Sequence, residues 1–288
     1  MFSRPPRYVA GLPEPGRSLV MGVVNVTPDS FSDGGRWLEP ERAAEHGRRL
    51  ARDGADIVDV GGESTRPGAV RPSVQEEMDR VLPVITALAS DGLLVSVDTM
   101  RAEVAEEAAR AGAALVNDVS GGRADPAMFD VVARSGVPYV LMHWRAHSTE
   151  MQERTEYADV VADVMAELRK QLDRAVRAGI APDKIALDPG IGFSKTAEQN
   201  WDVLAATDEF HAMGQPLLIA TSRKRFLGVL LADESGQLRP PVERDDGTTA
   251  TSALAAAAGA WCIRAHSVRA TADAVRVASR WAGGRHRP

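Results

Sequence analysis

Cysteine is almost absent from this chain of 288 residues, in which Cys262 is the single example. One cysteine allows neither an internal disulfide nor a zinc cluster built from several thiolates. Because Cys262 stands inside the apolar stretch Ala260–Ile263, we expect it to be a small residue of the core rather than a reactive thiol.

Long hydrophobic runs are also missing. The longest stretch of apolar residues and glycine, 253–263, covers 11 residues and is too short to span a bilayer. The first eight residues contain two prolines and two arginines, but they lack the apolar segment that a secretory signal requires. We therefore expect a cytoplasmic protein without a membrane partner.

Basic residues are not in excess, since 34 Lys plus Arg stand against 40 Asp plus Glu and the formal net charge is -6. A uniformly basic surface for nucleic acid is thereby excluded, whereas a local pocket for an anion is not. The composition, 44% hydrophobic and 26% charged, is that of an ordinary globular protein.

Short β-branched runs alternate with longer stretches rich in Ala, Glu and Arg that have helical spacing, which is typical of repeated βα units around a parallel sheet. The eight predicted strands are residues 19–24, 57–60, 94–97, 114–116, 139–142, 185–187, 217–220 and 261–263. The helical candidates include residues 40–53, 74–89, 102–111, 127–134, 158–178 and 268–281. This count predicts an α/β fold, a single (β/α)8 TIM barrel, with a doubly wound open sheet as the alternative.

The chain contains no stretch that reads as an interdomain linker. We expect one domain over residues 1–288, with a core from about residue 18 to 282 and short flexible termini. The polar segment 233–247 predicts a long surface loop before the last helix and strand. His46, His211 and His286 are expected at the surface or in the tail.

Polar residues follow every predicted strand, and in such barrels the carboxyl ends of the strands meet at one mouth, where the chemistry occurs. The polar residues at or just after the ends of the eight strands are Asn25, Asp59, Asp98, Asn117, His143, Asp188, Ser222 with Lys224, and Arg264 with His266. Taken singly, some of these polar residues also have a purely structural explanation. Asp98 is equally suited to cap the helix near Arg101, and Asp59 to accept backbone hydrogen bonds under a loop. Helix caps that arise by chance do not explain polar residues at the ends of all eight strands.

Three of the loops at this mouth carry more functional side chains than a simple turn requires. Residues 25–35 and 61–69 are long for βα connections and predict lids. Their glycines match neither a Walker A loop nor a G-x-G-x-x-G fingerprint. In the third loop, residues 188–195, Asp188 and Phe193 bring a carboxylate and an aromatic ring to the same mouth.

Two kinds of ligand chemistry are represented among these residues. Asp98, Asn117 and Asp188 suit a flat nitrogen heterocycle with several N–H donors, because carboxylates accept paired hydrogen bonds from such an edge. The positively charged set suits a phosphate or diphosphate, with Asn25 as a hard oxygen ligand for magnesium. That set is Arg66, Lys224, Arg264 and His266.

A zinc hydrolase is a weaker alternative. His143 and His147 are four residues apart and would share one face of a helix. They lack the acidic context of the H-E-x-x-H type, and Trp144 and Arg145 stand between them.

Seven segments carry a resemblance to a known family. They are NVTPDSFSDGG (25–35), GGESTRPG (61–68), SVDT (96–99), NDVSG (117–121), DPGIGF (188–193), SRK (222–224) and RAH (264–266). In this order and with this spacing the chain resembles the bacterial dihydropteroate synthases, pterin-binding enzymes of folate biosynthesis and targets of sulfonamides. The resemblance covers about residues 19–281. One departure is Arg225, where many members have serine, which leaves a hydroxyl contact to aminobenzoate in doubt.

The resemblance implies a transferase that joins 7,8-dihydropterin-6-ylmethyl diphosphate to 4-aminobenzoate and releases 7,8-dihydropteroate and diphosphate. It also implies magnesium as cofactor, inhibition by sulfonamides and a homodimer paired through outer helices. The chemistry fits an SN1-like displacement, in which positive charge is delocalised on the pterin while the diphosphate leaves. No nucleophilic side chain is needed.

The resemblance also assigns roles by position. The pterin residues are Asp98, Asn117, Asp188 and Lys224, with Asp59 and Met142 lining the slot. The diphosphate residues are Thr65, Arg264 and His266, and the magnesium ligand is Asn25. The aminobenzoate residues are Phe31, Arg66, Pro67, Phe193, Ser222 and Lys224. The expected catalytic residues are Asp98, Lys224, Arg264 and His266.

Two alternatives share the pterin-binding barrel. A corrinoid methyltransferase would need the pterin slot but neither the two motif-bearing loops nor the pair Arg264 and His266. An inactive paralogue that only binds pterins would be expected to have lost part of a loop or of this pair. All of these features are present in the sequence.

Overall fold

Eight parallel strands form the centre of the protein in the computed structural model, which describes residues 6–27, 39–63, 71–146 and 154–283. The strands are β1 (Leu19–Asn25), β2 (Ile57–Gly61), β3 (Val95–Asp98), β4 (Leu115–Asp118), β5 (Tyr139–Met142), β6 (Ile185–Asp188), β7 (Leu218–Ile219) and β8 (Cys262–Ala265). Their order is β6-β5-β4-β3-β2-β1-β8-β7. A parallel bridge between Leu187 and Leu217 joins β6 to β7. The predicted barrel is confirmed, and the open sheet was the wrong alternative.

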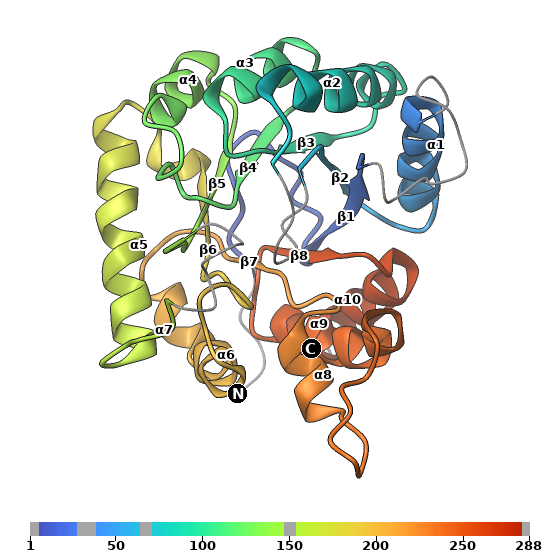
Figure 1. Ribbon diagram of the computed structural model, residues 1–288, viewed down its shortest axis with the longest axis vertical. Coiled ribbons are helices and arrows are strands. Elements are labelled where there is room, and N and C mark those ends of the chain that lie inside the picture. The colour runs from blue at the N-terminus through green and yellow to red at the C-terminus, as the bar shows by residue number, and fades with distance from the viewer. Residues whose placement is uncertain (1–5, 28–38, 64–70, 147–153, 284–288) are drawn as a thin grey trace.

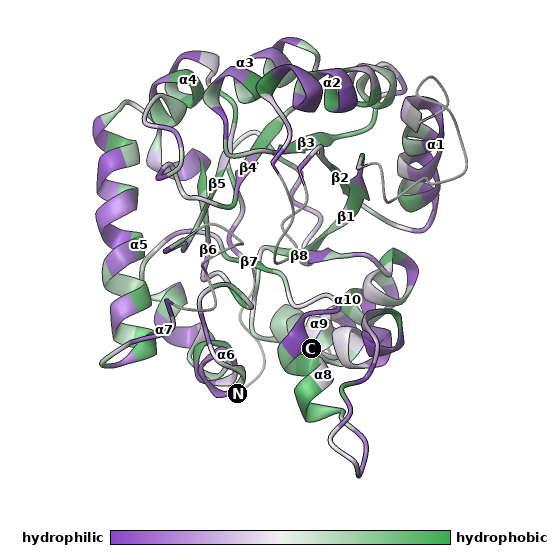
Figure 2. Cartoon of the chain, viewed as in Figure 1, coloured by the Kyte–Doolittle hydropathy of each residue, from purple (hydrophilic) through white to green (hydrophobic). Residues whose placement is uncertain are grey.

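The helices surround this barrel (Figure 1). They are α1 (Glu39–Arg52), α2 (Val74–Ser90), α3 (Ala102–Arg110), α4 (Met128–Ser135), α5 (Val160–Arg177), α6 (Ala197–Ala205), α7 (Thr207–His211), α8 (Arg225–Leu230), α9 (Asp245–Ala257) and α10 (Val268–Gly283). Figure 2 shows apolar strands in the centre, with polar residues concentrated on the outer faces of the helices. This is the pattern expected when both faces of a parallel sheet are buried.

Several predicted strands extend further toward the mouth than their apolar runs. Asp98, Asn117, Asp188 and Arg264 belong to strands, and their register pairs Gly61 with Asp98 and Asp98 with Asn117. The backbone hydrogen bonds between strands continue past the last apolar residue, because the neighbouring strand still supplies N–H and C=O groups. These four candidates are therefore held on strands, whereas His143, Ser222, Lys224 and His266 follow the ends of strands.

One predicted loop is shorter than expected. The segment 233–247 gives way to a 3-10 turn, Pro241–Arg244, and α9 begins at Asp245. The apolar pattern of this helix is weak, because it buries Thr248, Thr251 and Ser252. Hydroxyl groups of these residues bond to backbone carbonyls one turn earlier, so the buried face is polar in sequence but satisfied in structure.

The bottom of the barrel is closed by the segment before β1. Val9 and Leu12 are buried against strand residues such as Met21 and Leu115. The packed core therefore begins before residue 18, where the sequence placed its start. Arg17 secures the segment through two bonds to Asp56, of 2.7 and 2.8 Å.

Two single-residue expectations have opposite outcomes. Cys262 is fully buried in β8, and burial raises the pKa of its thiol. The surface position expected for His211 is wrong, since this residue is 1% exposed and its Nε2 lies 3.0 Å from the carbonyl oxygen of Ala258. His286 lies outside the described residues.

Among the helices of the described residues, we find none that is long and apolar enough to cross a membrane.

Candidate active site

Arg264 lies at the centre of the barrel mouth and joins two strands by ion pairs. Its Nε donates to Oδ2 of Asp59 at 2.6 Å, and its Nη2 donates to Oδ2 of Asp98 at 2.7 Å. Asn117 adds a third contact, from Nδ2 to Oδ2 of Asp59 at 3.0 Å. The four side chains come from β8, β2, β3 and β4, and the guanidinium links β8 to both β2 and β3.

The protonation of this cluster follows from burial and charge. Burial raises the pKa of Asp98 to about 7, because the nearby carboxylates add to desolvation and together outweigh Arg264. For Arg264, burial opposes the charged form, but the attraction of Asp59 and Asp98 prevails and raises its pKa. The guanidinium is thus permanently charged, whereas Asp98 can exchange a proton near neutral pH.

Asp59 keeps one free acceptor. Its side chain is fully buried, and among the described atoms its Oδ1 has no hydrogen-bond partner. The alternative in which Asp59 accepts backbone hydrogen bonds is not what the structure shows, because its contacts are with Asn117 and Arg264. A buried carboxylate oxygen left without a donor is costly, and a ligand N–H group would satisfy it.

Lys224 and Asp188 occupy the opposite side of the mouth. The Nζ of Lys224 donates to the carbonyl oxygen of Ile191 and lies 4.8 Å from the centre of the Phe193 ring. Burial lowers the pKa of Lys224 to about 8 despite the attraction of Asp188. Burial also raises the pKa of Asp188, whose Oδ1 accepts from the amide of Gly190 at 2.7 Å.

Gly192 makes room for the lysine chain. Its φ is +82°, and a Cβ there would lie 2.7 Å from Cδ of Lys224. A side chain at this position would therefore be strained and would also displace the lysine. The second glycine of DPGIGF is therefore required for a steric reason, because it leaves space for the side chain of Lys224.

Ser222 and His266 form a second polar pair beside Arg264. The hydroxyl of Ser222 accepts from the backbone N–H of His266 at 3.1 Å and lies 2.9 Å from its Nδ1. A hydroxyl oxygen can accept two hydrogen bonds, so either atom of the second contact can be the donor. Burial, with Arg264 nearby, lowers the pKa of His266 to about 3. The imidazole is thus neutral and keeps one N–H donor.

The other described candidates line the same region. Met142 is 3% exposed and belongs to a small apolar cluster with Met100 and Val119, against which Phe193 packs. Asn25 is the last residue of β1 and is half-buried. Arg225 begins α8 with an exposed side chain. Phe31, Thr65, Arg66 and Pro67 lie outside the described residues.

The NDVSG motif has a structural aspartate next to its site residue. Asp118 accepts from the amides of Ser120 and Gly122 at 2.7 Å each, and from the hydroxyl of Tyr139 at 2.6 Å. These bonds hold the turn that follows β4. Asp118 thereby fixes the backbone from which Asn117 reaches Asp59.

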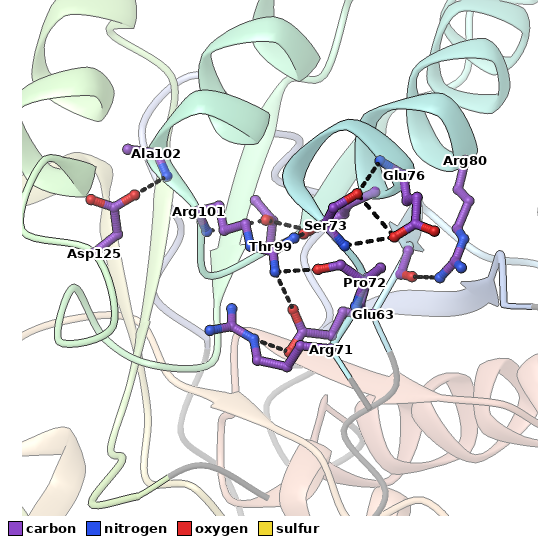
Figure 3. Close-up of polar contacts among 12 residues, drawn as sticks. Glu63, Arg71, Pro72, Ser73, Glu76, Arg80, Thr99, Arg101, Ala102 and Asp125 are labelled. Atoms are coloured by element: carbon purple, nitrogen blue, oxygen red, sulfur yellow. Dashed lines mark hydrogen bonds and ion pairs between the residues drawn. The ribbon is translucent and has the colours of Figure 1, made fainter. Parts of the chain in front are cut away.

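The segment 64–70 is bracketed by an ion pair. Glu63 lies just before it and Arg71 just after it, with 2.7 Å between Oε1 and Nε (Figure 3). Arg80 of α2 adds a bond of 2.9 Å to the carbonyl oxygen of Gly62. The two ends of this motif-bearing segment are therefore held together.

A buried carboxylate links this bracket to the end of β3. Glu77 of α2 is fully buried, accepts from the hydroxyl of Thr99 at 2.6 Å and from Arg101 at 2.7 Å. Arg101 also donates to the carbonyl oxygen of Pro72 at 2.5 Å, as Figure 3 shows. Sequence reasoning missed this arrangement, because Glu77 lies inside an ordinary amphipathic helix.

The cap reading of Asp98 is wrong. The first amide of α3, that of Ala102, donates to Oδ2 of Asp125 at 2.8 Å (Figure 3). Asp98 instead pairs with Arg264. Helix α3 is thus capped from the loop after the next strand, which leaves Asp98 available to the site.

A buried lysine that sequence reasoning left without a role stabilises the loop after β6. Lys195 is 5% exposed, and its Nζ lies 3.0 Å from the carbonyl oxygen of Gly190, 3.2 Å from that of Phe193 and 3.1 Å from Nδ1 of His143. Burial lowers its pKa to about 7. The ammonium of Lys195 thus donates hydrogen bonds to carbonyl oxygens of the loop that carries Phe193.

His143 serves this loop rather than a metal. Its Nδ1 faces Lys195, and its Nε2 lies 3.0 Å from Oε2 of Glu167, which also pairs with Arg145 at 2.6 Å. Both ring nitrogens are therefore used, and His147 is not among the described residues. Within the described part of the chain, no group of three or more His, Cys, Asp and Glu suits a metal ion.

The barrel brings buried carboxylates, an amide and a guanidinium together at one mouth. The profile of the family described as "Pterin binding enzyme" matches residues 21–266. The chain is 54% identical to the dihydropteroate synthase of Mycobacterium leprae over 91% of this chain and 93% of that protein, and 44% identical to that of Escherichia coli (strain K12), with coverages of 90% and 89%.

Solved structures agree with these relatives. The Xanthomonas albilineans dihydropteroate synthase with 4-aminobenzoic acid has a TM-score of 0.85 and 44% identity, with 94% of each chain covered. The Yersinia pestis enzyme with a sulfonamide drug complex has a TM-score of 0.86 and 41% identity, with coverages of 95% and 98%. The chain belongs to the dihydropteroate synthases, a family of transferases within the pterin-binding enzymes.

The environment of His143 predicts acid sensitivity. Burial lowers the pKa of its imidazole to about 4 from an ordinary 6.5, so below pH 6.5 the unfolded chain binds a proton that the folded chain refuses. The contribution of His143 to the free energy of unfolding is fully present above that pH and is lost on acidification. From pH 7 to pH 5 this histidine should cost the wild type about 2 kcal/mol.

Urea unfolding of the wild type and of His143→Gln at both pH values measures this effect. The variant should lose about 2 kcal/mol less than the wild type between pH 7 and pH 5, and His266 accounts for part of the remaining loss. Equal losses in the two proteins would show that His143 is not buried in its neutral form.

Proposed function

We propose that this chain catalyses the condensation of 7,8-dihydropterin-6-ylmethyl diphosphate with 4-aminobenzoate, giving 7,8-dihydropteroate and diphosphate. The observation that carries the proposal is the meeting of buried carboxylates and cations at one mouth, centred on Arg264 between Asp59 and Asp98. The relative from Xanthomonas albilineans has been solved with 4-aminobenzoic acid and with 7,8-dihydropteroate, which supports the same substrates here.

Asp98, Asn117, Asp188 and Lys224 bind the pterin in this proposal, in a slot lined by Asp59 and Met142. The carboxylates accept from ring and exocyclic N–H groups, and Lys224 donates to a ring acceptor. Burial makes these hydrogen bonds specific, because an unpaired polar group there is costly.

Departure of the diphosphate separates charge. As the C–O bond breaks, positive charge spreads over the pterin and negative charge grows on the leaving group. The carboxylate-lined slot stabilises the cation, while Arg264, Lys224, Thr65 and His266 stabilise the diphosphate. Electrostatic stabilisation of this kind accelerates the reaction because it acts where charge develops in the transition state.

The amine of 4-aminobenzoate then attacks the methylene carbon, forms the C–N bond and loses one proton to the released diphosphate or to water. Positioning supplies the remaining catalysis. Phe193 and the aliphatic part of Lys224 form one wall for the aromatic ring. Phe31, Arg66, Pro67 and Ser222 complete this subsite, and sulfonamides would compete for it. No side chain has to act as a nucleophile.

Magnesium fits this mouth in a limited way. Asn25 offers one hard amide oxygen from the end of β1, and Mg²⁺ generally keeps waters and shares substrate phosphate oxygens. Asn25 would hold the ion together with the diphosphate rather than alone. The ion, when bound, neutralises negative charge on the leaving group.

We also propose a homodimer, in line with a cytoplasmic biosynthetic enzyme. Large apolar side chains are exposed on three neighbouring elements at one side of the barrel, α8, α9 and α10 (Figure 1). They include Leu230 at 63%, Leu254 at 57%, Val277 at 63% and Trp281 at 77%. An exposed group of this kind favours association.

Arg264→Ala tests the proposed chemistry. Purified wild type, supplied with dihydropterin diphosphate and magnesium, should release diphosphate only when aminobenzoate is added. The variant should lose about 2–4 kcal/mol of transition-state stabilisation, the usual cost of a missing charge-stabilising donor. Arg269→Ala, which removes an arginine that is 78% exposed, serves as the control.

Parental turnover by Arg264→Ala would disprove the role given to this residue. Tight pterin binding by the wild type without aminobenzoate-dependent release would favour the inactive paralogue. Methyl transfer from methyltetrahydrofolate to a corrinoid, without diphosphate release, would favour the methyltransferase.

Sedimentation equilibrium tests the dimer. The wild type should sediment at twice the chain mass, and Trp281→Glu should shift the equilibrium toward the monomer because it places a charge in an apolar contact. Val176→Glu changes a residue that is 37% exposed on α5 and should leave the dimer intact. A monomeric wild type at micromolar concentration would refute this part of the proposal.

A further inference from the structure

Arg223 has an uncommon backbone conformation between two residues of the mouth. Its φ is 59°, and among the described residues other than glycine only Ser194 also has a positive φ, of 48°. A residue with a Cβ is disfavoured in this left-handed region and stays there only if its surroundings compensate. The middle residue of the SRK motif has no role in the proposed chemistry.

The surroundings hold Arg223 by its side chain and by both backbone groups. Its Nε and Nη2 donate to the two carboxylate oxygens of Asp245, each at 2.8 Å. Its amide donates to the hydroxyl of Thr248 at 3.1 Å, and its carbonyl oxygen accepts from Nη1 of Arg244 at 2.9 Å. The three partners lie at the beginning of α9 and in the turn before it.

Arg244 is itself held rigidly. It is 8% exposed and also donates from Nε to the carbonyl oxygen of Arg239 at 2.6 Å. A Cβ on Gly228 of α8 would lie 2.6 Å from Nε of Arg244, so this guanidinium packs directly against the helix backbone. The contact to Arg223 therefore comes from a fixed donor.

The conformation of Arg223 decides where its two neighbours point. Ser222 bonds to His266, and Lys224 reaches the carbonyl oxygen of Ile191 and the ring of Phe193. A rotation at Arg223 would move these two side chains relative to each other. A bidentate arginine–carboxylate pair fixes geometry better than a single bond does.

We propose that Arg223 is a positioning residue, and that its bidentate pair with Asp245 of α9 sets the place of the Lys224 ammonium at the barrel mouth. The kinetic consequence rests on the proposed function. The placement of Lys224 does not, and it can be measured without substrates.

The lysine content makes this measurement simple. The chain has four lysines, Lys170, Lys184, Lys195 and Lys224. Lys170 is exposed on α5 and serves as the internal reference. Lys195 is buried in the same mouth and bonds to the same loop after β6 as Lys224, but it belongs to that loop and does not follow Arg223 in the chain. Brief acetylation followed by peptide mass spectrometry gives the labelling rate of each amine.

Two variants remove the pair in different ways. Arg223→Gly accepts the positive φ without strain but has no guanidinium, and Asp245→Asn keeps the shape of the partner but not its charge. The matched control is Asp91→Ala, which breaks an arginine–aspartate contact of 2.7 Å to Arg48 on the surface.

We expect acetylation of Lys224 relative to Lys170 to rise roughly tenfold in both variants, which is the scale of losing a charge-assisted hydrogen bond. The Lys195 rate should not change, and the double variant should exceed neither single variant. In the synthase assay, kcat/KM should fall by about tenfold to a hundredfold, as for a misplaced group. Asp91→Ala should match the wild type in both measurements.

Several results would overturn the proposal. Wild-type labelling of Lys224 in Arg223→Gly would mean that the backbone alone positions the lysine. Equal acceleration of Lys195 and Lys224 would indicate general loosening of the barrel instead. A wild type without synthase activity would refute the proposed function, while the labelling experiment would still decide the role of Arg223.

Discussion

The buried pairing of Arg264 with Asp59 and Asp98 is the interaction on which the mouth of this barrel depends. A guanidinium and two carboxyl groups inside a protein lose much hydration, and only close contacts of good geometry recover that cost. The distances of 2.6 and 2.7 Å meet this requirement. They link side chains of β2, β3 and β8, so the pairing constrains both the charges and the relative placement of these strands.

The other cations of the mouth are held by backbone oxygens as much as by acids. Lys195 contacts two carbonyl oxygens of the loop after β6, and Lys224 contacts a third. Burial lowers the pKa values of these amines to about 7 and about 8. The loop that follows β6 is therefore held by two amines, one from its own end and one from the loop after β7.

Much of this could be predicted from the sequence because it depends on local patterns. Apolar runs with polar ends predicted the eight strands and most site residues, including Arg264. The pairing of Arg264 with Asp59 could not be predicted, since these residues are 205 positions apart. The start of α9 at Asp245 could not be predicted, because this helix buries hydroxyl groups where apolar side chains would mark a helix. The capping of α3 by Asp125 could not be predicted either, because the carboxylate comes from another loop. Lys195 was left without a role because its partners are mostly carbonyl groups, which every sequence has.

A double-mutant cycle on unfolding tests the central interaction most directly. The cycle uses Arg264→Met, Asp98→Asn and the double variant at pH 8, above the pKa of about 7 for Asp98, so that the carboxylate is ionised. We predict a coupling free energy of about 2–3 kcal/mol between the two residues. Additive effects, within about 0.5 kcal/mol, would contradict the claim that this pair holds the mouth together.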